Sequence, residues 1–113
     1  MQSDLLRQLN QERAAGRPVV LVTVLNTRGS TPRKAGSQML VMGDGAIRGT
    51  IGGGLAEAQA MAEAGRAFIS HASSVHRMTM TNSVAALEGM ACGGDMEVFV
   101  QYIEEPDEAL RNG

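Results

Sequence analysis

The hydrophobic pattern of the first quarter of the chain predicts one helix followed by one buried strand. Apolar residues first recur at helical spacing, and the helix is predicted to begin at Ser3 or Asp4 and to stop at Gly16. Residues 19–26 are rich in β-branched side chains and apolar on both faces, which is typical of a central strand.

The middle of the chain predicts a hairpin and a second helix. Residues 37–42 and 46–51 read as short strands, because the glycines at the intervening turn favour a hairpin. The second strand leads into three glycines, after which a helix is predicted to about Ser70. The predicted apolar face of this helix consists of Leu55, Ala58, Met61, Ala62, Gly65, Phe68 and Ile69. Because several of these residues are small, we expect the helix to lie close to a sheet.

The last third of the chain is predicted to contain two strands. Residues 75–82 alternate as in a half-exposed strand, and residues 83–90 read as a short helix or a turn. A glycine-rich loop at 91–94 precedes another buried strand at 96–103, and residues 105–113 read as a flexible acidic tail.

These elements predict a single α+β domain over residues 1–113, with a mixed sheet of about five strands and two main helices. A length of 113 residues is close to the commonest domain size. The predicted fold therefore needs no second core.

Composition narrows the expected partners and compartment. A formal charge of −2 and an aromatic content of 3% offer little attraction or stacking surface to nucleic acid, which we do not expect as a partner. The longest apolar run, residues 19–25, is too short for a membrane helix, so no membrane association is expected. A single cysteine and a polar first segment without a secretory pattern favour a cytoplasmic protein.

A glycine run offers one candidate anion site. Gly52, Gly53 and Gly54 lie between a predicted strand and a predicted helix, where backbone N–H groups at the positive end of a helix dipole favour phosphate. A sharp turn with close packing explains the same glycines equally well, and their spacing matches neither the dinucleotide nor the P-loop fingerprint.

A basic loop offers a second candidate anion site. Arg33 and Lys34 supply a forked and a point-like cation beside the hydroxyls of Ser30 and Thr31, a combination that is common in phosphate sites. A solvated loop without a ligand is the alternative interpretation.

Two further residues, one with a carboxylate and one with a thiol, lie close to glycines in the sequence. If Gly54 caps the helix, Glu57 lies in its first turn, where it can reach back to the cap or accept N–H groups of a bound heterocycle. Cys92 precedes Gly93 and Gly94 in a loop whose amides favour a thiolate, although a buried apolar cysteine is the alternative.

Three segments in the same order and spacing resemble the N-terminal domain of the XdhC/CoxI family. They are residues 29–36 (GSTPRKAG), residues 49–54 (GTIGGG) followed by Glu57, and residues 90–94 (MACGG), and the resemblance covers about residues 15–104. It implies an accessory protein that binds molybdenum cofactor as cargo and helps to insert it into a xanthine-dehydrogenase-type hydroxylase. Such a protein is a cofactor-binding chaperone more than a catalyst.

The resemblance also implies partners: the apo form of a molybdenum hydroxylase and a sulfur-donating desulfurase. Leu55 stands where many relatives have a cysteine, which puts thiol chemistry there in doubt. Relatives often add a Rossmann-like domain that does not follow here, so the resemblance implies a short stand-alone form or a separated fragment.

Two other functions are compatible with the residues. One is a small enzyme that acts on a phosphorylated metabolite, with Cys92 as nucleophile or Glu57 as base. The other is a structural interaction module in which the glycines serve packing only. Symmetric self-association into a homo-oligomer is compatible with all three functions.

Overall fold

The computed structural model describes residues 3–29, 34–79 and 94–104 of the chain. Three predictions lie outside these residues: the short helix or turn at 83–90, most of the glycine-rich loop at 91–94, and the tail at 105–113. The predicted single domain over residues 1–113 stays a prediction.

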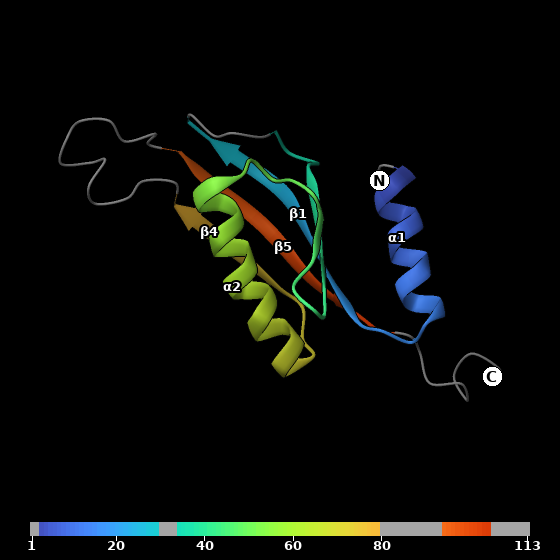
Figure 1. The fold of residues 1–113 in the computed structure, drawn as a ribbon. Helices are drawn as coiled ribbons and strands as arrows, with labels where there is room; N and C mark the ends of the chain where they lie inside the picture. Colours follow the sequence, from blue (N-terminus) through green and yellow to red (C-terminus); the bar gives the residue numbers. More distant parts are fainter. Residues whose placement is uncertain (1–2, 30–33, 80–93, 105–113) are drawn as a thin grey trace.

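Five strands form one sheet, with a helix before it in sequence and another between its third and fourth strands (Figure 1). The elements are α1 (Ser3–Ala14), β1 (Val19–Arg28), β2 (Gln38–Met42), β3 (Ile47–Gly49), α2 (Gly54–Ser70), β4 (Ser74–Thr79) and β5 (Asp95–Ile103). The α+β class, the five strands and the two helices are confirmed.

The sheet is antiparallel throughout, so the predicted mixture of parallel and antiparallel strands is wrong. Its order is β3-β2-β1-β5-β4, and all four neighbouring pairs are antiparallel. β4 runs in the same direction as β1, but β5 lies between them and pairs with both. No parallel pair therefore forms among these strands.

The two helices cover opposite faces of the sheet (Figure 1). Val20, Val22 and Val24 face α2, whereas Val19 and Leu21 alternate to the other face and pack with the leucines of α1. This alternation follows from the period of two along a strand. The first part of β1 is buried on both faces, which explains why its sequence lacks the alternation of polar and apolar residues that marks a half-exposed strand.

The buried face of α2 differs from the predicted one. Its buried residues are four alanines, Ala56, Ala60, Ala64 and Ala67. Met61 and Phe68 border this core as predicted, but Leu55 and Ile69 are exposed, and Ile69 is 86% accessible. The predicted close contact of α2 with the sheet is confirmed. The residues that make it are one position away from several of the residues predicted.

α1 carries a buried carboxylate that joins the helix to the strand after it. Glu12 accepts a hydrogen bond from Gln8 Nε2 at 3.1 Å and pairs with Arg17, just before β1. The hydrogen bond and charge of Glu12 raise the pKa of Arg17. Neither described helix is long and apolar enough to cross a bilayer.

Tyr102 fastens the far end of α2 to β5. Its ring stacks on His71 with the centroids 4.8 Å apart and meets Phe68 edge-on. His71 has a left-handed backbone at the C-cap of α2, and the Tyr102 N–H donates to Ser73 Oγ at 2.9 Å. The phenol donates to Glu104 Oε2 at 2.9 Å.

We expect Tyr102 to ionise at higher pH in the folded protein than in the unfolded chain. Partial burial is the main cause of the raised pKa, and the hydrogen bond and charge of Glu104 add to it. Since the raised pKa favours the neutral phenol, its contribution to stability is full below about pH 10 and is lost as pH rises through the folded-state pKa. The chain has one tyrosine and no tryptophan, so absorbance at 295 nm reports this residue alone.

The matched variant for this titration is Glu104→Gln. Its absorbance midpoint should fall below that of the unaltered protein but stay above that of the urea-unfolded chain, because burial remains. Equal midpoints in the folded and unfolded protein would contradict the assignment.

Candidate functional site

The three motif-bearing segments are attached to one end of the sheet. β1 ends at Arg28, where the basic loop begins, and β5 begins at Asp95, just after the cysteine loop; these two residues are register partners. Gln59, in the second turn of α2, donates to the Thr79 carbonyl at 3.0 Å, and Thr79 pairs with Asp95. The start of α2 therefore lies at this same end, as Figure 1 shows.

The glycine run turns the chain into α2 through a backbone that favours glycine. Gly52, Gly53 and Gly54 have φ values of 126°, 74° and 48°. The N-cap of α2 is Gly53, one residue before the predicted Gly54. A Cβ built on Gly53 or Gly54 would meet nothing within 4 Å, so the space beside these two residues is open.

The loop is held by two side chains. Glu57 Oε2 accepts the Gly53 N–H at 2.8 Å, as the sequence suggested, and also the Thr50 hydroxyl. Thr50 Oγ1 accepts the Gly52 N–H at 3.0 Å. Thr50 was missed from sequence because it stands seven residues before Glu57, whereas a capping box has a spacing of three.

These bonds divide the amides at the helix start into two groups. Those of Gly52 and Gly53 are occupied, whereas those of Gly54, Leu55 and Ala56 precede the first helical hydrogen bond, from Glu57 N–H to the Gly53 carbonyl. None of the three has a partner among the described residues. They are the amides that an anion at this helix start would meet.

Glu57→Ala is expected to destabilise the fold by about 1–2 kcal/mol, because it leaves the Gly53 amide and the Thr50 hydroxyl without their shared acceptor. Glu57→Gln keeps an acceptor oxygen and should cost less. Urea unfolding of both variants measures the difference. If neither variant changes the unfolding midpoint, the two bonds do not hold the loop.

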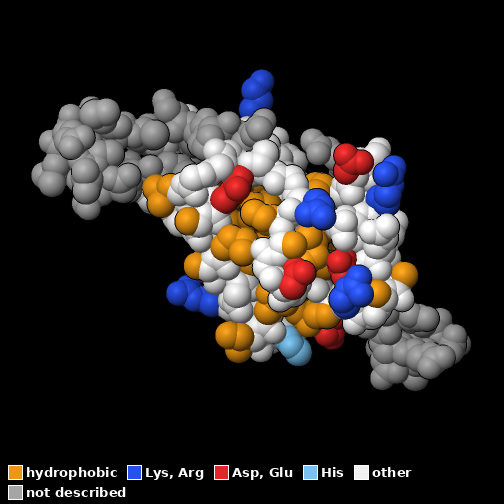
Figure 2. All heavy atoms as spheres, in the orientation of Figure 1, with side chains coloured by type: hydrophobic (Ala, Val, Ile, Leu, Met, Phe, Trp, Pro, Cys, Tyr) orange, Lys and Arg blue, Asp and Glu red, His pale blue; other side chains and the backbone are white. Residues whose placement is uncertain are grey.

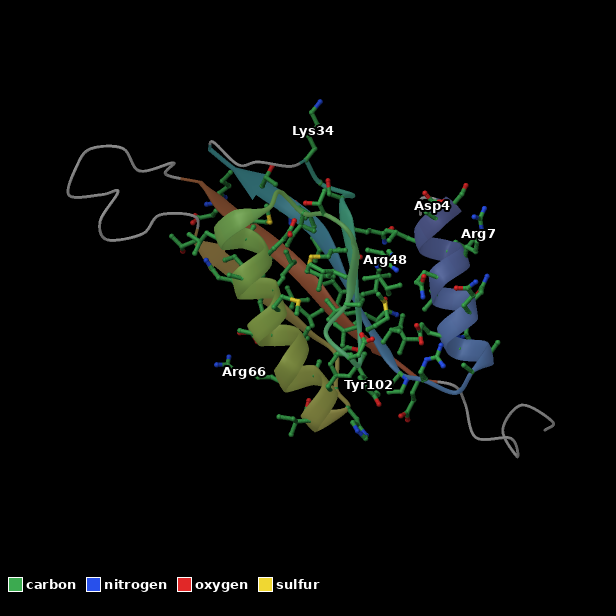
Figure 3. The ribbon with its side chains drawn as sticks, viewed as in Figure 1. Asp4, Arg7, Lys34, Arg48, Arg66 and Tyr102 are labelled. Carbon is green, nitrogen blue, oxygen red and sulfur yellow. The ribbon has the colours of Figure 1, made fainter. Side chains whose placement is uncertain are left out.

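Of the basic loop, the structure describes Lys34 but not residues 30–33. The Lys34 side chain is exposed and extends away from the sheet (Figure 3). The chain then returns to β1: Gly36 N–H donates to the Val24 carbonyl at 2.7 Å, and Val24 N–H donates to the Ser37 carbonyl at 2.9 Å.

The structure thus places five predicted site residues and leaves five outside the described part. Those placed are Lys34, Gly52, Gly53, Gly54 and Glu57; those outside are Ser30, Thr31, Arg33, Cys92 and Gly93. Arg28 and Asp95, where the described strands end, are register partners, and α2 begins at the same end of the sheet.

A cleft of about 410 Å³ opens at this end. It is lined by Asn26, Thr27, Arg28, Arg77, Asp95, Met96 and Glu97. A register shift between Val24 and Asn26 marks a bulge in β1, which leaves Leu25 39% accessible. Sequence reasoning missed the cleft because no regular alternation reveals a bulge.

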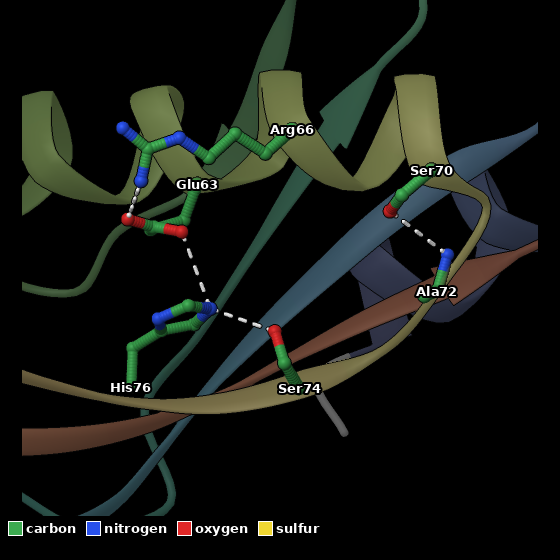
Figure 4. A network of polar contacts seen from close by, with 6 residues as sticks. All are labelled: Glu63, Arg66, Ser70, Ala72, Ser74 and His76. Atoms are coloured by element: carbon green, nitrogen blue, oxygen red, sulfur yellow. Dashed lines mark hydrogen bonds and ion pairs between the residues drawn. The ribbon is translucent and has the colours of Figure 1, made fainter.

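A polar cluster between α2 and β4 does not have the geometry of a catalytic triad (Figure 4). His76 Nε2 lies 2.7 Å from Ser74 Oγ and 3.2 Å from Glu63 Oε2, so both partners share one ring nitrogen. A serine nucleophile requires its acid on the opposite nitrogen. Arg66 also pairs with Glu63, at 2.8 Å.

The described residues show no metal cluster, and the described part of the face in Figure 2 shows no large charged patch. No group of three or more His, Cys, Asp or Glu side chains among them could hold a metal ion. Figure 2 shows apolar side chains near the centre of one face, with acidic and basic side chains spread singly around them. The described part of that face has no extended basic patch.

Comparison with protein families gives a match over more than half of the chain. The model of the XdhC and CoxI family matches residues 12–79. The Escherichia coli protein YqeB, which is uncharacterized, is 39% identical over 83 residues, covering 74% of this chain and 15% of YqeB.

The fold is also found in a solved structure. A crystal structure described as a xanthine dehydrogenase from Bacillus halodurans aligns over 95% of this chain and 32% of its own, with a TM-score of 0.70 and 23% identity. This chain thus spans about a seventh of the curated relative and a third of the solved one.

Proposed function

Because this chain belongs to the XdhC and CoxI family, we propose that it binds molybdenum cofactor and helps to insert it into a molybdenum hydroxylase of the xanthine dehydrogenase type. The observation that carries the proposal is the convergence of three motif-bearing segments at one end of the sheet. Arg28 and Asp95, which flank two of them, are register partners, and α2 begins beside them.

The groups at this end suit the phosphate of the cofactor. The unpartnered amides of Gly54, Leu55 and Ala56 lie at the positive end of the α2 dipole, and no Cβ narrows the approach at Gly53 or Gly54. Exposed Lys34 supplies a cation from the neighbouring loop.

The remaining predicted residues complete the proposed site. Arg33, Ser30 and Thr31 would add donors to the phosphate, while Cys92 and Gly93 would border the cofactor from the loop before β5. In this proposal Glu57 shapes the glycine loop, because its carboxylate is occupied by the loop itself.

The proposed partners follow from the same function. The apo hydroxylase receives the cofactor, and a desulfurase in the cytoplasm supplies its terminal sulfur. A homo-oligomer is compatible with the proposal but is not required by it.

Gel filtration tests the proposal directly. Purified protein is mixed anaerobically with cofactor released from a molybdenum hydroxylase, and molybdenum and pterin fluorescence are measured in the protein fractions. We expect both to co-elute with the protein. Their absence, with the protein folded by circular dichroism, would overturn the proposal.

Replacing Arg33 and Lys34 together by alanine should weaken cofactor binding about tenfold at low salt. The difference from the unaltered protein should shrink as salt rises, because screening weakens the cation–phosphate contacts in both proteins. Arg66→Ala is the matched control, since Arg66 lies on the exposed side of α2 (Figure 3). A loss that is independent of salt would contradict the role given to the basic loop.

A further inference from the structure

The cleft at the loop end of the sheet is built from two cross-strand rows. One row is Asn26, Glu97 and Arg77, and the next is Arg28, Asp95 and Thr79. In both rows the acid lies on β5, in the middle, while an arginine lies on the strand to one side. Residues two apart along a strand share a face, so both rows face the same side of the sheet.

The charges of these rows are not paired with one another. Asn26 Nδ2 donates to Glu97 Oε1 at 2.9 Å. Among the described residues, the side chains of Arg28, Arg77 and Asp95 make no hydrogen bond or ion pair, although Arg28 is the register partner of Asp95 and Arg77 that of Glu97. Two guanidinium groups and one carboxylate therefore line the cleft with their bonding capacity unused.

This arrangement selects for a particular ligand chemistry. A carboxylate accepts two parallel hydrogen bonds from adjacent N–H groups, and guanidinium groups bind anions in the same bidentate manner. A carboxylate acceptor between two guanidinium groups therefore fits a flat heterocycle that has two adjacent N–H donors on one edge and also carries an anionic group. The volume of about 410 Å³ lies within the range of small-molecule sites, roughly 300–1,000 Å³.

We propose that Asp95 accepts the N–H edge of a 2-amino-4-oxo heterocycle, the edge shared by pterin and guanine, and that Arg28 and Arg77 bind the anionic group of the same ligand. Met96 and Val98 of β5 pack in the core with α2, so Asp95 and Glu97 face the opposite side of the sheet. The cleft is therefore a ligand site separate from the start of α2, and the inference goes beyond the proposed function.

Paired probes test the proposal. Pterin is compared with lumazine, which has a 2-oxo group in place of the 2-amino group, and GMP is compared with IMP, which lacks the 2-amino group. We expect at least a tenfold preference for the 2-amino member of one pair. The analogue that lacks the 2-amino group would leave one oxygen of the Asp95 carboxylate without a hydrogen bond. A preference within the pterin pair identifies pterin as the source, and one confined to the nucleotide pair identifies guanine.

Asp95→Asn should reduce that preference to less than about threefold, because an amide presents only one acceptor oxygen. Asp4→Asn is the matched control, with the same charge change on an exposed residue of α1 (Figure 3). Arg28→Gln combined with Arg77→Gln should remove most of the advantage of GMP over guanosine or of a phosphorylated pterin over its alcohol. Asp95→Ser provides the same test if the asparagine variant does not fold.

Two results would overturn the inference: no preference for either 2-amino compound, or a preference that survives in both Asp95 variants. Co-elution of released cofactor alongside such a result would leave the proposed function intact. If the cofactor does not bind but a pterin preference depends on Asp95, the proposed function is overturned and the inference about the cleft is supported.

Discussion

Ala60→Leu is expected to destabilise the protein by about 2–3 kcal/mol. Ala60 has no accessible surface and lies on the face of α2 that packs against the sheet. A leucine adds three carbon atoms where the helix approaches closely, so either the helix moves away or neighbouring side chains leave their preferred rotamers. The expected result is a lower urea midpoint with an unchanged slope.

The control for this substitution is Ala62→Leu on the same helix. Ala62 belongs to the face predicted from sequence, but the structure leaves it exposed. Leucine there should change the free energy of unfolding by no more than about 0.5 kcal/mol. If Ala62→Leu were the more damaging variant, the helix would present its predicted face and the arrangement described above would be wrong.

Gly49→Ala is expected to cost about 3 kcal/mol. Gly49 has a φ of 79°, which costs an alanine about 1–2 kcal/mol, and its added Cβ would lie 2.6 Å from the Gln38 carbonyl oxygen. It would also lie 3.2 Å from a methyl carbon of Leu5. Because the closest atom belongs to the backbone of the paired strand, β2 and β3 must separate to admit it.

Gly45→Ala separates these two causes. Gly45 has a similar φ of 90°, but its added Cβ would meet nothing within 4 Å. We expect a loss of about 1–2 kcal/mol from backbone strain alone. Equal losses at both positions would show that the contact with Gln38 is unimportant.

The fold was largely predictable because apolar residues recur at a clear helical or strand spacing in most elements. The glycines at the hairpin and the buried run of β1 placed these elements within one or two residues. The face of α2 was less predictable, since alanines alternate with larger apolar residues around the helix and Ile69 proved to be exposed. Strand pairing was not encoded locally, because inserting β5 between β1 and β4 depends on contacts far apart in sequence.

The candidate site was predictable as a set of segments but not as a geometry. Sequence reasoning found the glycine run and the reach of Glu57 to the cap, but it missed the hydroxyl of Thr50 that shares that carboxylate. It also missed the cleft, because Arg28 and Asp95 are far apart in sequence and become neighbours only through strand register. Long-range pairing of this kind leaves no local pattern.

Amide mapping tests the central claim, that cofactor binds at the loop end of the sheet. Nitrogen-15-labelled protein is titrated anaerobically with released cofactor and followed by two-dimensional NMR. We expect the largest shifts at residues 27–36, 52–57 and 91–97, with residues 3–14 of α1 almost unchanged. Shifts confined to α1, or no shifts at cofactor concentrations above that of the protein, would contradict the account.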